Sequence, residues 1–179
     1  MGAEAVSASK APASTAPSAA LRPFLSGDTP ALASIARESI FALTGEDYDE
    51  DQQEAWAGFA EDEAGLAARL SAALTLVATR DGEPCGFIAL ADNKMIDLLY
   101  VHPEMAGEGI GALLCDAIEK LATARGATSL TVDASDTALG FFQKRGYVGK
   151  SRNTVQRSGV WLGTTTMEKL LSAGDAPLH

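Results

Sequence analysis

The sequence has few cysteines and no long apolar run, and both absences narrow what the protein can be. Its two cysteines, Cys85 and Cys115, stand in apolar stretches without a CxxC motif or a neighbouring group of histidines. Two such thiols cannot form a disulfide framework and do not suggest a metal site, so we expect a reduced protein without metal. No stretch approaches the ~20 apolar residues that span a bilayer, and the N-terminus lacks the regions of a signal peptide. We therefore expect a cytoplasmic protein with no membrane partner.

Positive charge is also scarce. The 179 residues include 14 lysines and arginines against 24 aspartates and glutamates, which gives a formal net charge of −10. Nucleic-acid phosphates would repel such a chain, so we expect no nucleic-acid partner. No cation lies between Arg37 and Arg69, where ten acidic residues occur. These acids either form a solvated helical face or create a field that attracts a cationic amine.

Composition divides the chain into one domain and two short tails. Residues 1–20 are nearly all Ala, Ser, Pro, Thr and Gly, which is typical of a disordered tail. We place a single α/β domain at 21–172 and a C-terminal tail at 173–179. Hydrophobic residues make up 46% of the chain, which is enough to build a core for one domain of this length.

Hydrophobic periodicity and turn residues predict the order of elements within the domain. The first part contains a strand at 21–25, helices at 30–44 and 49–59, and a further helical piece at 63–72. An antiparallel meander then occupies 74–79, 85–90 and 95–101. The last part contains a helix from 110 to about 125, a strand at 129–133, a short helix capped by Ser135, and strands at 147–155 and 159–168.

The most informative segment runs from Ile96 to Leu114. It contains a buried strand, a proline turn, three alternating glycines and the start of a helix. Gly107, Gly109 and Gly111 leave one side of the backbone free of side chains. Their N–H groups can point together at an anion, and the positive end of the helix dipole reinforces them. The segment therefore predicts a phosphate-binding turn.

One interpretation of the glycines is a dinucleotide-binding fold. Gly107, Gly109 and Ala112 satisfy the G-x-G-x-x-G/A pattern, and Asp133 follows about 20 residues later. In that fold the strand runs almost directly into the first glycine, whereas residues 102–106 intervene here. The strands before the glycines are joined by hairpins and are therefore antiparallel, whereas that fold needs parallel strands. Both observations disfavour a dinucleotide site.

Two segments resemble the landmarks of the GNAT N-acetyltransferase superfamily, in particular its small bacterial members. Residues 99–103 are Leu-Tyr-Val-His-Pro, and 106–111 are Ala-Gly-Glu-Gly-Ile-Gly. They resemble the family's Val-x-Pro strand end and its Gln/Arg-x-x-Gly-x-Gly/Ala pyrophosphate loop. Residues 135–147, Ser-Asp-Thr-Ala-Leu-Gly-Phe-Phe-Gln-Lys-Arg-Gly-Tyr, are similar to Asn-x-x-Ala-x-x-aromatic-Tyr-x-x-x-Gly-aromatic. The order of elements matches from about residue 21 to residue 171.

The resemblance implies a mixed, mostly antiparallel sheet with helices on both faces. Its central parallel strands, here 95–101 and 129–133, would splay apart and hold acyl-CoA in the gap. The expected donor is acetyl-CoA, and the expected acceptor is a primary amine on a small molecule or peptide. The residues expected to bind the cofactor are Leu99, Val101, Ala106, Gly107, Glu108, Gly109, Ile110, Gly111, Ala112, Ser135, Phe141 and Phe142.

Three positions depart from the family's pattern. Ala106 replaces Gln or Arg but keeps its N–H, so we expect weaker cofactor binding rather than its loss. Ser135 replaces Asn and can still cap a helix. Phe142 replaces the Tyr that protonates the departing CoA thiolate in many members, and phenylalanine has no proton to donate. Either water or Tyr147 then supplies the proton, or catalytic power has been lost.

Two aspartates are candidates for the general base. An acceptor amine with a pKa of ~10 is mostly protonated at pH 7, so a carboxylate that takes its proton would help. Strand alternation predicts that Asp97 shares a face with Leu99 and Val101. Asp133 ends the opposing strand.

Direct transfer in a ternary complex is the expected mechanism, because neither cysteine stands where it could carry an acyl group. The alternative is a non-catalytic acyl-CoA-binding sensor or partner module, which Ala106 and Phe142 favour. The resemblance also allows a homodimer.

Overall fold

The computed structural model describes residues 19–172, so the predicted C-terminal tail and all but the last two residues of the predicted N-terminal tail lie outside the described part. The helices are α1 (Thr29–Leu43), α2 (Glu50–Ala57), α3 (Glu63–Ala72), α4 (Ile110–Ala124) and α5 (Leu139–Lys144). Short 3-10 turns are η2 (Ser26–Asp28), η3 (Gly58–Ala60) and η4 (Pro103–Met105). The strands are β1 (Ala20–Pro23), β2 (Leu74–Arg80), β3 (Glu83–Ala91), β4 (Met95–Val101), β5 (Ser129–Ser135), β6 (Val148–Arg157) and β7 (Val160–Leu170).

Most of the predicted elements are confirmed, with two differences in the helices. The predicted helix at 49–59 is α2, which Asp49 caps by accepting from the Gln52 amide at 2.9 Å, followed by the turn η3. Ser135 does not cap α5, because it is the last residue of β5 and α5 begins only at Leu139. Its hydroxyl instead accepts from the Ala138 amide at 3.1 Å, in the turn before the helix.

The strands form one seven-stranded sheet in the order β1-β2-β3-β4-β5-β7-β6. Every neighbouring pair is antiparallel except β4 and β5, which are parallel. These two strands pair only at Met95 with Thr131 and at Ile96 with Val132. Beyond that point they diverge, so the predicted mixed sheet with a splayed parallel pair is confirmed.

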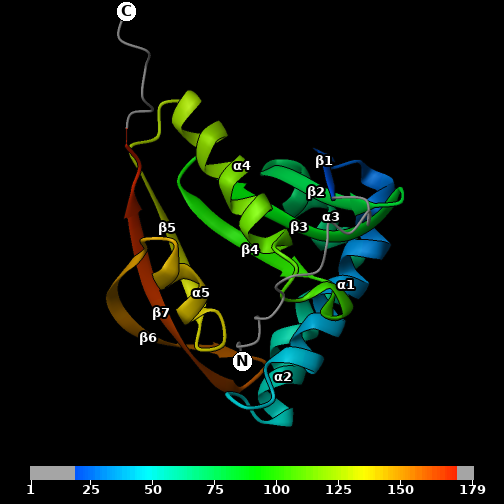
Figure 1. Ribbon diagram of the computed structural model, residues 1–179. Coiled ribbons are helices and arrows are strands. Elements are labelled where there is room, and N and C mark those ends of the chain that lie inside the picture. Colours follow the sequence, from blue (N-terminus) through cyan, green and yellow to red (C-terminus); the bar gives the residue numbers. More distant parts are fainter. Residues whose placement is uncertain (1–18, 173–179) are drawn as a thin grey trace, which may run out of the picture.

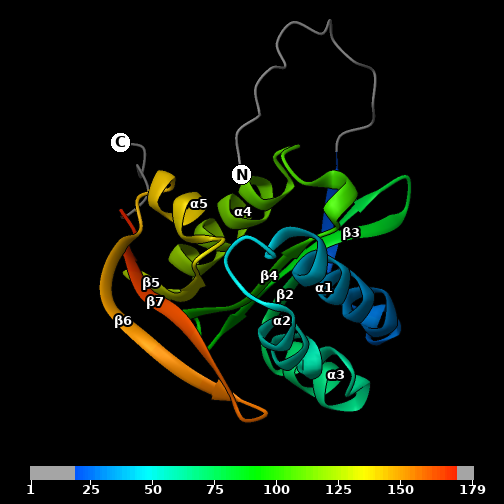
Figure 2. The same ribbon diagram turned by 90° about the horizontal axis from the view of Figure 1, so that it is seen from below.

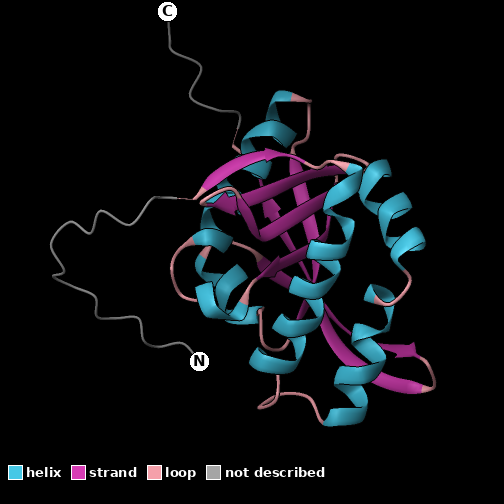
Figure 3. Cartoon of the chain, turned by 90° about the vertical axis from the view of Figure 1, so that its right-hand side faces the viewer, coloured by secondary structure: helices cyan, strands magenta, loops and turns pink. Residues whose placement is uncertain are grey.

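Helices cover both faces of the sheet and bury two hydrophobic clusters (Figures 1 and 2). On one face, α4 and α5 pack over a cluster that includes Ile118, Leu130 and Met167. On the other face, α1 and α3 pack over a cluster that includes Leu32 and Phe87. The side view in Figure 3 shows the same layers. No helix within residues 19–172 is long and apolar enough to cross a membrane.

A β-bulge in β4 changes the predicted face of one candidate residue. The register of β4 against β3 moves from Ala89 opposite Leu98 to Leu90 opposite Ile96, which leaves Asp97 as the extra residue. A bulge of this kind interrupts the two-residue alternation of side chains. Asp97 therefore lies on the α3 face, where it contacts Arg69, whereas Leu99 and Val101 pack into the α4 cluster. The prediction that the three share a face was wrong.

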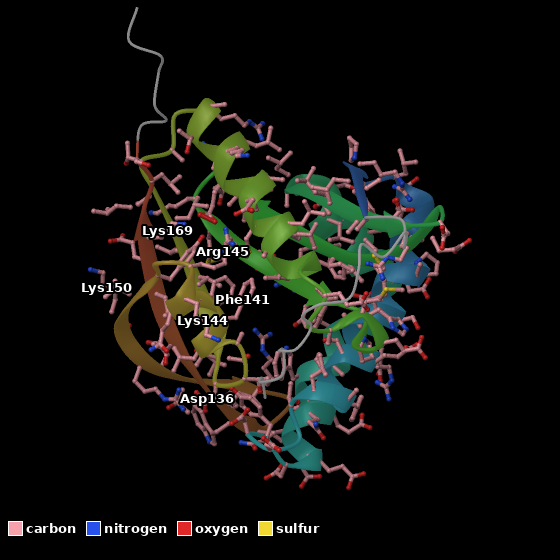
Figure 4. All side chains as sticks on the ribbon, in the orientation of Figure 1. Asp136, Phe141, Lys144, Arg145, Lys150 and Lys169 are labelled. Atoms are coloured by element: carbon pink, nitrogen blue, oxygen red, sulfur yellow. The ribbon has the colours of Figure 1, made fainter. Side chains whose placement is uncertain are left out.

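A buried ionic cluster joins α4 to α5 and β7. Glu119 of α4 is only 8% exposed, and it accepts from Arg145 at 2.6 Å and also from Lys169. Figure 4 shows Arg145 and Lys169 between α4 and the sheet. One carboxylate thus compensates two partly buried cations. It also holds the end of the motif at residues 135–147 against α4.

Replacing Glu119 by glutamine tests this cluster. We expect the free energy of unfolding to fall by about 3 kcal/mol, because removing one partner of a buried ion pair leaves the remaining charges buried without compensation. Equilibrium unfolding in urea measures the change. Asp116→Asn is the matched control, since Asp116 pairs with the same Arg145 but its side chain is 60% exposed. Equal losses in the two variants would contradict the role given to Glu119.

Candidate active site

Two cavities open where β4 and β5 diverge. The first has a volume of about 190 Å³ and lies between β4, β5, the β6–β7 hairpin and the helices α2 and α3. The second has a volume of about 220 Å³ and lies between α1, the end of β4, the start of α4 and α5. Both cavities are lined by Trp56, Leu99, Tyr100, Ser135 and Ala138. They therefore meet at the gap between the diverging strands.

The second cavity contains several of the residues predicted to contact a cofactor. Those that line it are Leu99, Val101, Gly111, Ser135 and Phe141. A Cβ atom on Gly111 would lie 3.4 Å from the ring of Phe141, so glycine keeps this end of the cavity open. The cavity thus leads from the start of α4 to the gap between the strands.

The glycine loop presents free backbone N–H groups next to this cavity. Gly107 and Gly109 have φ angles of 81° and 85°, a conformation that favours glycine, and no atom lies within 4 Å of the Cβ position of either. The first N–H groups of α4, at 110–112, have no partner within the helix. Together these groups form a side-chain-free site that suits a pyrophosphate.

Two of the predicted backbone donors of the loop are already used inside the protein. The Ala106 amide donates to the Pro103 carbonyl at 3.2 Å, and the Glu108 amide donates to the Met105 carbonyl at 3.3 Å. The Glu108 side chain also accepts from Arg80 at 2.8 Å. The free donors of the loop are therefore fewer than the sequence predicts, and a negative charge lies beside them.

Aromatic side chains form one wall of the first cavity. They are Tyr48, Trp56, Phe59 and Tyr100. The Trp56 Nε1–H donates to the Tyr100 hydroxyl at 2.9 Å, and the rings of Phe59 and Tyr100 pack with centroids 5.8 Å apart. Burial raises the pKa of Tyr100 to about 12, so its hydroxyl keeps its proton at neutral pH. Trp161, an aromatic residue of the nearby β7, is 56% exposed and lines neither cavity.

Tyr48 joins this wall to the opposite half of the sheet. Its hydroxyl donates to the Gly163 carbonyl at 2.7 Å and accepts from the Asp136 amide at 2.8 Å. Gln52 adds a bond from its Nε2 to the Trp161 carbonyl at 3.0 Å. The start of α2 is thereby held against the β6–β7 hairpin, and the two elements lie side by side in Figures 1 and 2.

Four charged residues line the first cavity. Arg69 donates to both carboxylate oxygens of Asp97, at 2.6 and 2.8 Å, and this bond raises the pKa of the arginine further. Asp133 is exposed and accepts from the Thr166 hydroxyl at 2.6 Å. Arg157 completes the set. None of the ten acidic residues between Arg37 and Arg69 lines either cavity, so their charge acts only from outside.

Of the two positions considered for the proton donor to the CoA thiolate, only one borders a cavity. Phe142 lines the first cavity and is 2% exposed. Tyr147 lines neither cavity: it is also 2% exposed and packs against Phe142, with ring centroids 5.2 Å apart. Burial raises the pKa of Tyr147, and its hydroxyl has no hydrogen-bond partner among residues 19–172. The site therefore brings Asp97, Asp133 and Phe142 together and leaves Tyr147 in the core.

Sequence reasoning did not identify Tyr48, Arg69, Arg157 or Thr164 as site residues. Tyr48 lies in a loop, and Arg157 lies in the last hairpin, so neither belongs to a motif. The only signal was that Tyr48 is an aromatic residue within an otherwise acidic stretch. The positions of all four depend on how distant segments pack around the diverging strands.

Comparisons with known proteins agree with this geometry. The model of the acetyltransferase (GNAT) domain matches residues 44–171. The uncharacterised N-acetyltransferase YafP of Escherichia coli is 30% identical over 141 residues, covering 79% of this chain and 89% of that protein. A GCN5-related N-acetyltransferase of Rhodopseudomonas palustris is 56% identical, with a TM-score of 0.85 over 88% of this chain and 99% of its own.

A coenzyme A complex has the same fold. The PaiA N-acetyltransferase of Thermoplasma acidophilum, solved with coenzyme A, is 24% identical, with a TM-score of 0.71 over 86% of this chain and 99% of its own. Acetyl-CoA is the co-substrate that the match to the acetyltransferase family supports. The chain belongs to the GNAT acetyltransferase family and is an acetyl-CoA-dependent N-acetyltransferase.

Proposed function

We propose that the protein transfers an acetyl group from acetyl-CoA directly to a primary amine, with both substrates bound at once. The meeting of the two cavities at the diverging strands carries this proposal. One cavity adjoins the phosphate-binding loop, and the other has aromatic walls and charged residues. Holding both reactants in contact supplies much of the rate of such a reaction.

The cofactor is assigned to the loop and the second cavity. The free N–H groups of Gly107, Gly109 and residues 110–112 would hold the pyrophosphate. Beyond Ile96 the edge of β4 that faces β5 has no strand partner, so its peptide groups can bond the pantetheine arm near Leu99 and Val101. Acetyl-CoA supplies the acetyl group as a thioester. The same unpaired N–H groups can stabilise the oxyanion that forms at its carbonyl.

Asp133 is the better placed of the two candidate bases. Both oxygens of Asp97 already accept from Arg69, whereas Asp133 is bonded only by a hydroxyl among the described residues. Asp133 can attract the acceptor ammonium and take its proton, which frees the amine for attack on the acetyl carbonyl. Phe142 cannot return a proton to the departing thiolate, so we assign that role to water at the junction.

Direct transfer also fits the state of the two thiols. Cys85 and Cys115 are buried and unpaired, and burial raises the pKa of Cys115 to about 12. A protonated, buried thiol is a poor nucleophile, which argues against a cysteine-bound acetyl intermediate. Free thiols also fit the cytoplasmic setting that we propose.

The Glu108→Gln variant tests the cofactor assignment. Removing a negative charge beside the loop should tighten acetyl-CoA binding about threefold, with a smaller gain at high salt because screening weakens the repulsion. Isothermal titration calorimetry at two salt concentrations measures the effect. Glu104→Gln, which changes another exposed acid outside the loop, is the control. An unchanged affinity for acetyl-CoA in Glu108→Gln would argue against the assignment of the cofactor to this loop.

Acetyl transfer and its base are tested by following CoA thiol release with a panel of primary amines. We expect release with at least one amine, and an Asp133→Asn variant about 100-fold lower in kcat/KM at pH 7. The defect should shrink as the pH approaches the pKa of the amine, because a neutral amine needs no base. Asp97→Asn should lower kcat/KM less and without this recovery.

Other outcomes have distinct meanings. A larger, pH-recoverable loss in Asp97→Asn would transfer the role of base to Asp97. Acetyl-CoA binding without CoA release for any amine would overturn the proposed function and support a non-catalytic acyl-CoA-binding module.

A further inference from the structure

One face of the β6–β7 hairpin points into the first cavity. Val155 and Arg157 of β6 and Leu162 and Thr164 of β7 all line it, as the two-residue alternation of strands requires. Val155 is paired with Leu162, and Arg157 with Val160 at the hairpin end. The Arg157 side chain is therefore directed to the cavity by strand geometry.

The same stripe of side chains continues across β7 to β5. Thr164 is opposite Ser135, and Thr166 is opposite Asp133. From the hairpin end inward, the wall thus carries a cation, two apolar side chains, two hydroxyls and a carboxylate. The Thr164 hydroxyl oxygen is buried without a hydrogen-bond partner among residues 19–172, as expected where a bound molecule or water would complete the wall.

The two ends of this stripe carry charges that the described part of the protein does not pair. Arg69 is neutralised by Asp97, but no ion pair to Arg157 or to Asp133 is present within residues 19–172. A free guanidinium in a protein of net charge −10 favours an anionic ligand group, which it can bind through two N–H donors. A cationic acceptor alone would use only the Asp133 end.

We infer that the acceptor is a primary amine that also carries a carboxylate, with Arg157 binding the carboxylate and Asp133 facing the amine. The inference rests on the proposed function and names its substrate class. Ser135, which lines both cavities, marks their junction, and its partner on β7 is Thr164. Arg157 is opposite Val160, four residues nearer the hairpin end of β7. Four strand residues span about 13 Å between the junction and the backbone of Arg157. The arginine side chain covers part of this distance, and the ligand has to cover the rest.

The spacing selects the kind of acceptor. An α-amino acid holds its two groups too close together, whereas an aromatic ring between them would span the apolar part of the stripe. Such a ring would also pack against Trp56 and Phe59 on the opposite wall. The amine and carboxylate are therefore expected at opposite ends of a flat, apolar body.

The test compares para-(aminomethyl)benzoate with benzylamine, which has the same ring and amine but no carboxylate. In the unaltered protein, we expect kcat/KM for the carboxylate-bearing amine to be about tenfold higher, the size of one charge-assisted contact. Arg157→Gln should bring the ratio close to one by lowering kcat/KM for para-(aminomethyl)benzoate alone. Arg125→Gln, which changes an exposed arginine at the far end of α4, should leave the ratio unchanged.

Calorimetric binding of both amines in the presence of CoA gives a second readout that needs no turnover. A binding preference that Arg157→Gln removes, without CoA release, would support the carboxylate assignment while the proposed function fails. Equal binding of the two amines, equal weakening of both by Arg157→Gln, or no binding of either at millimolar concentration would overturn the inference.

Discussion

The divergence of β4 and β5 is the constraint on which the site depends. Only two residue pairs join these parallel strands, and beyond Ile96 the backbone of β4 lacks a partner on that side. Unpaired peptide groups inside a sheet cost free energy unless another group bonds them. The bulge that leaves Asp97 unpaired with β3 lies at the same point. The fold thus holds an open edge in its centre, and both cavities meet there.

Contacts at a distance keep that gap open at a fixed width. On the α4 side, Glu119 binds Arg145 and Lys169, which come from α5 and β7 beyond the gap. On the other side, Tyr48 bonds Gly163 and Asp136. The two halves of the sheet are therefore connected across both faces where β4 and β5 no longer pair. A site built this way is pre-organised, because the helices define its geometry before any ligand binds.

Sequence reasoning predicted the parts of the site that depend on local chemistry. The glycine loop needs positive φ angles at Gly107 and Gly109, and the splayed pair follows from recognising two motifs. It failed where tertiary packing decides the outcome. The alternation rule misplaced Asp97 because a bulge is invisible in a single sequence. Tyr147 was considered for catalysis, yet it fills the core beside Phe142. Tyr48 enters the site through hydrogen bonds to Gly163 and Asp136, which are 115 and 88 residues away in the sequence.

The charge distribution explains how an acidic protein can bind an anionic cofactor. Phosphates need no arginine when backbone N–H groups at a helix start are free, so the loop can work despite Glu108, whose charge Arg80 partly offsets. The acidic residues between Arg37 and Arg69 stay outside both cavities, while Tyr48, Trp56 and Phe59 from the same stretch line the first cavity. Within the first cavity, two arginines balance two aspartates, so the wall is neutral in sum but separated into a positive and a negative end. A neutral, dipolar wall discriminates by the orientation of a ligand more than by its net charge, and this fits the proposed acceptor, which would present its amine to the gap.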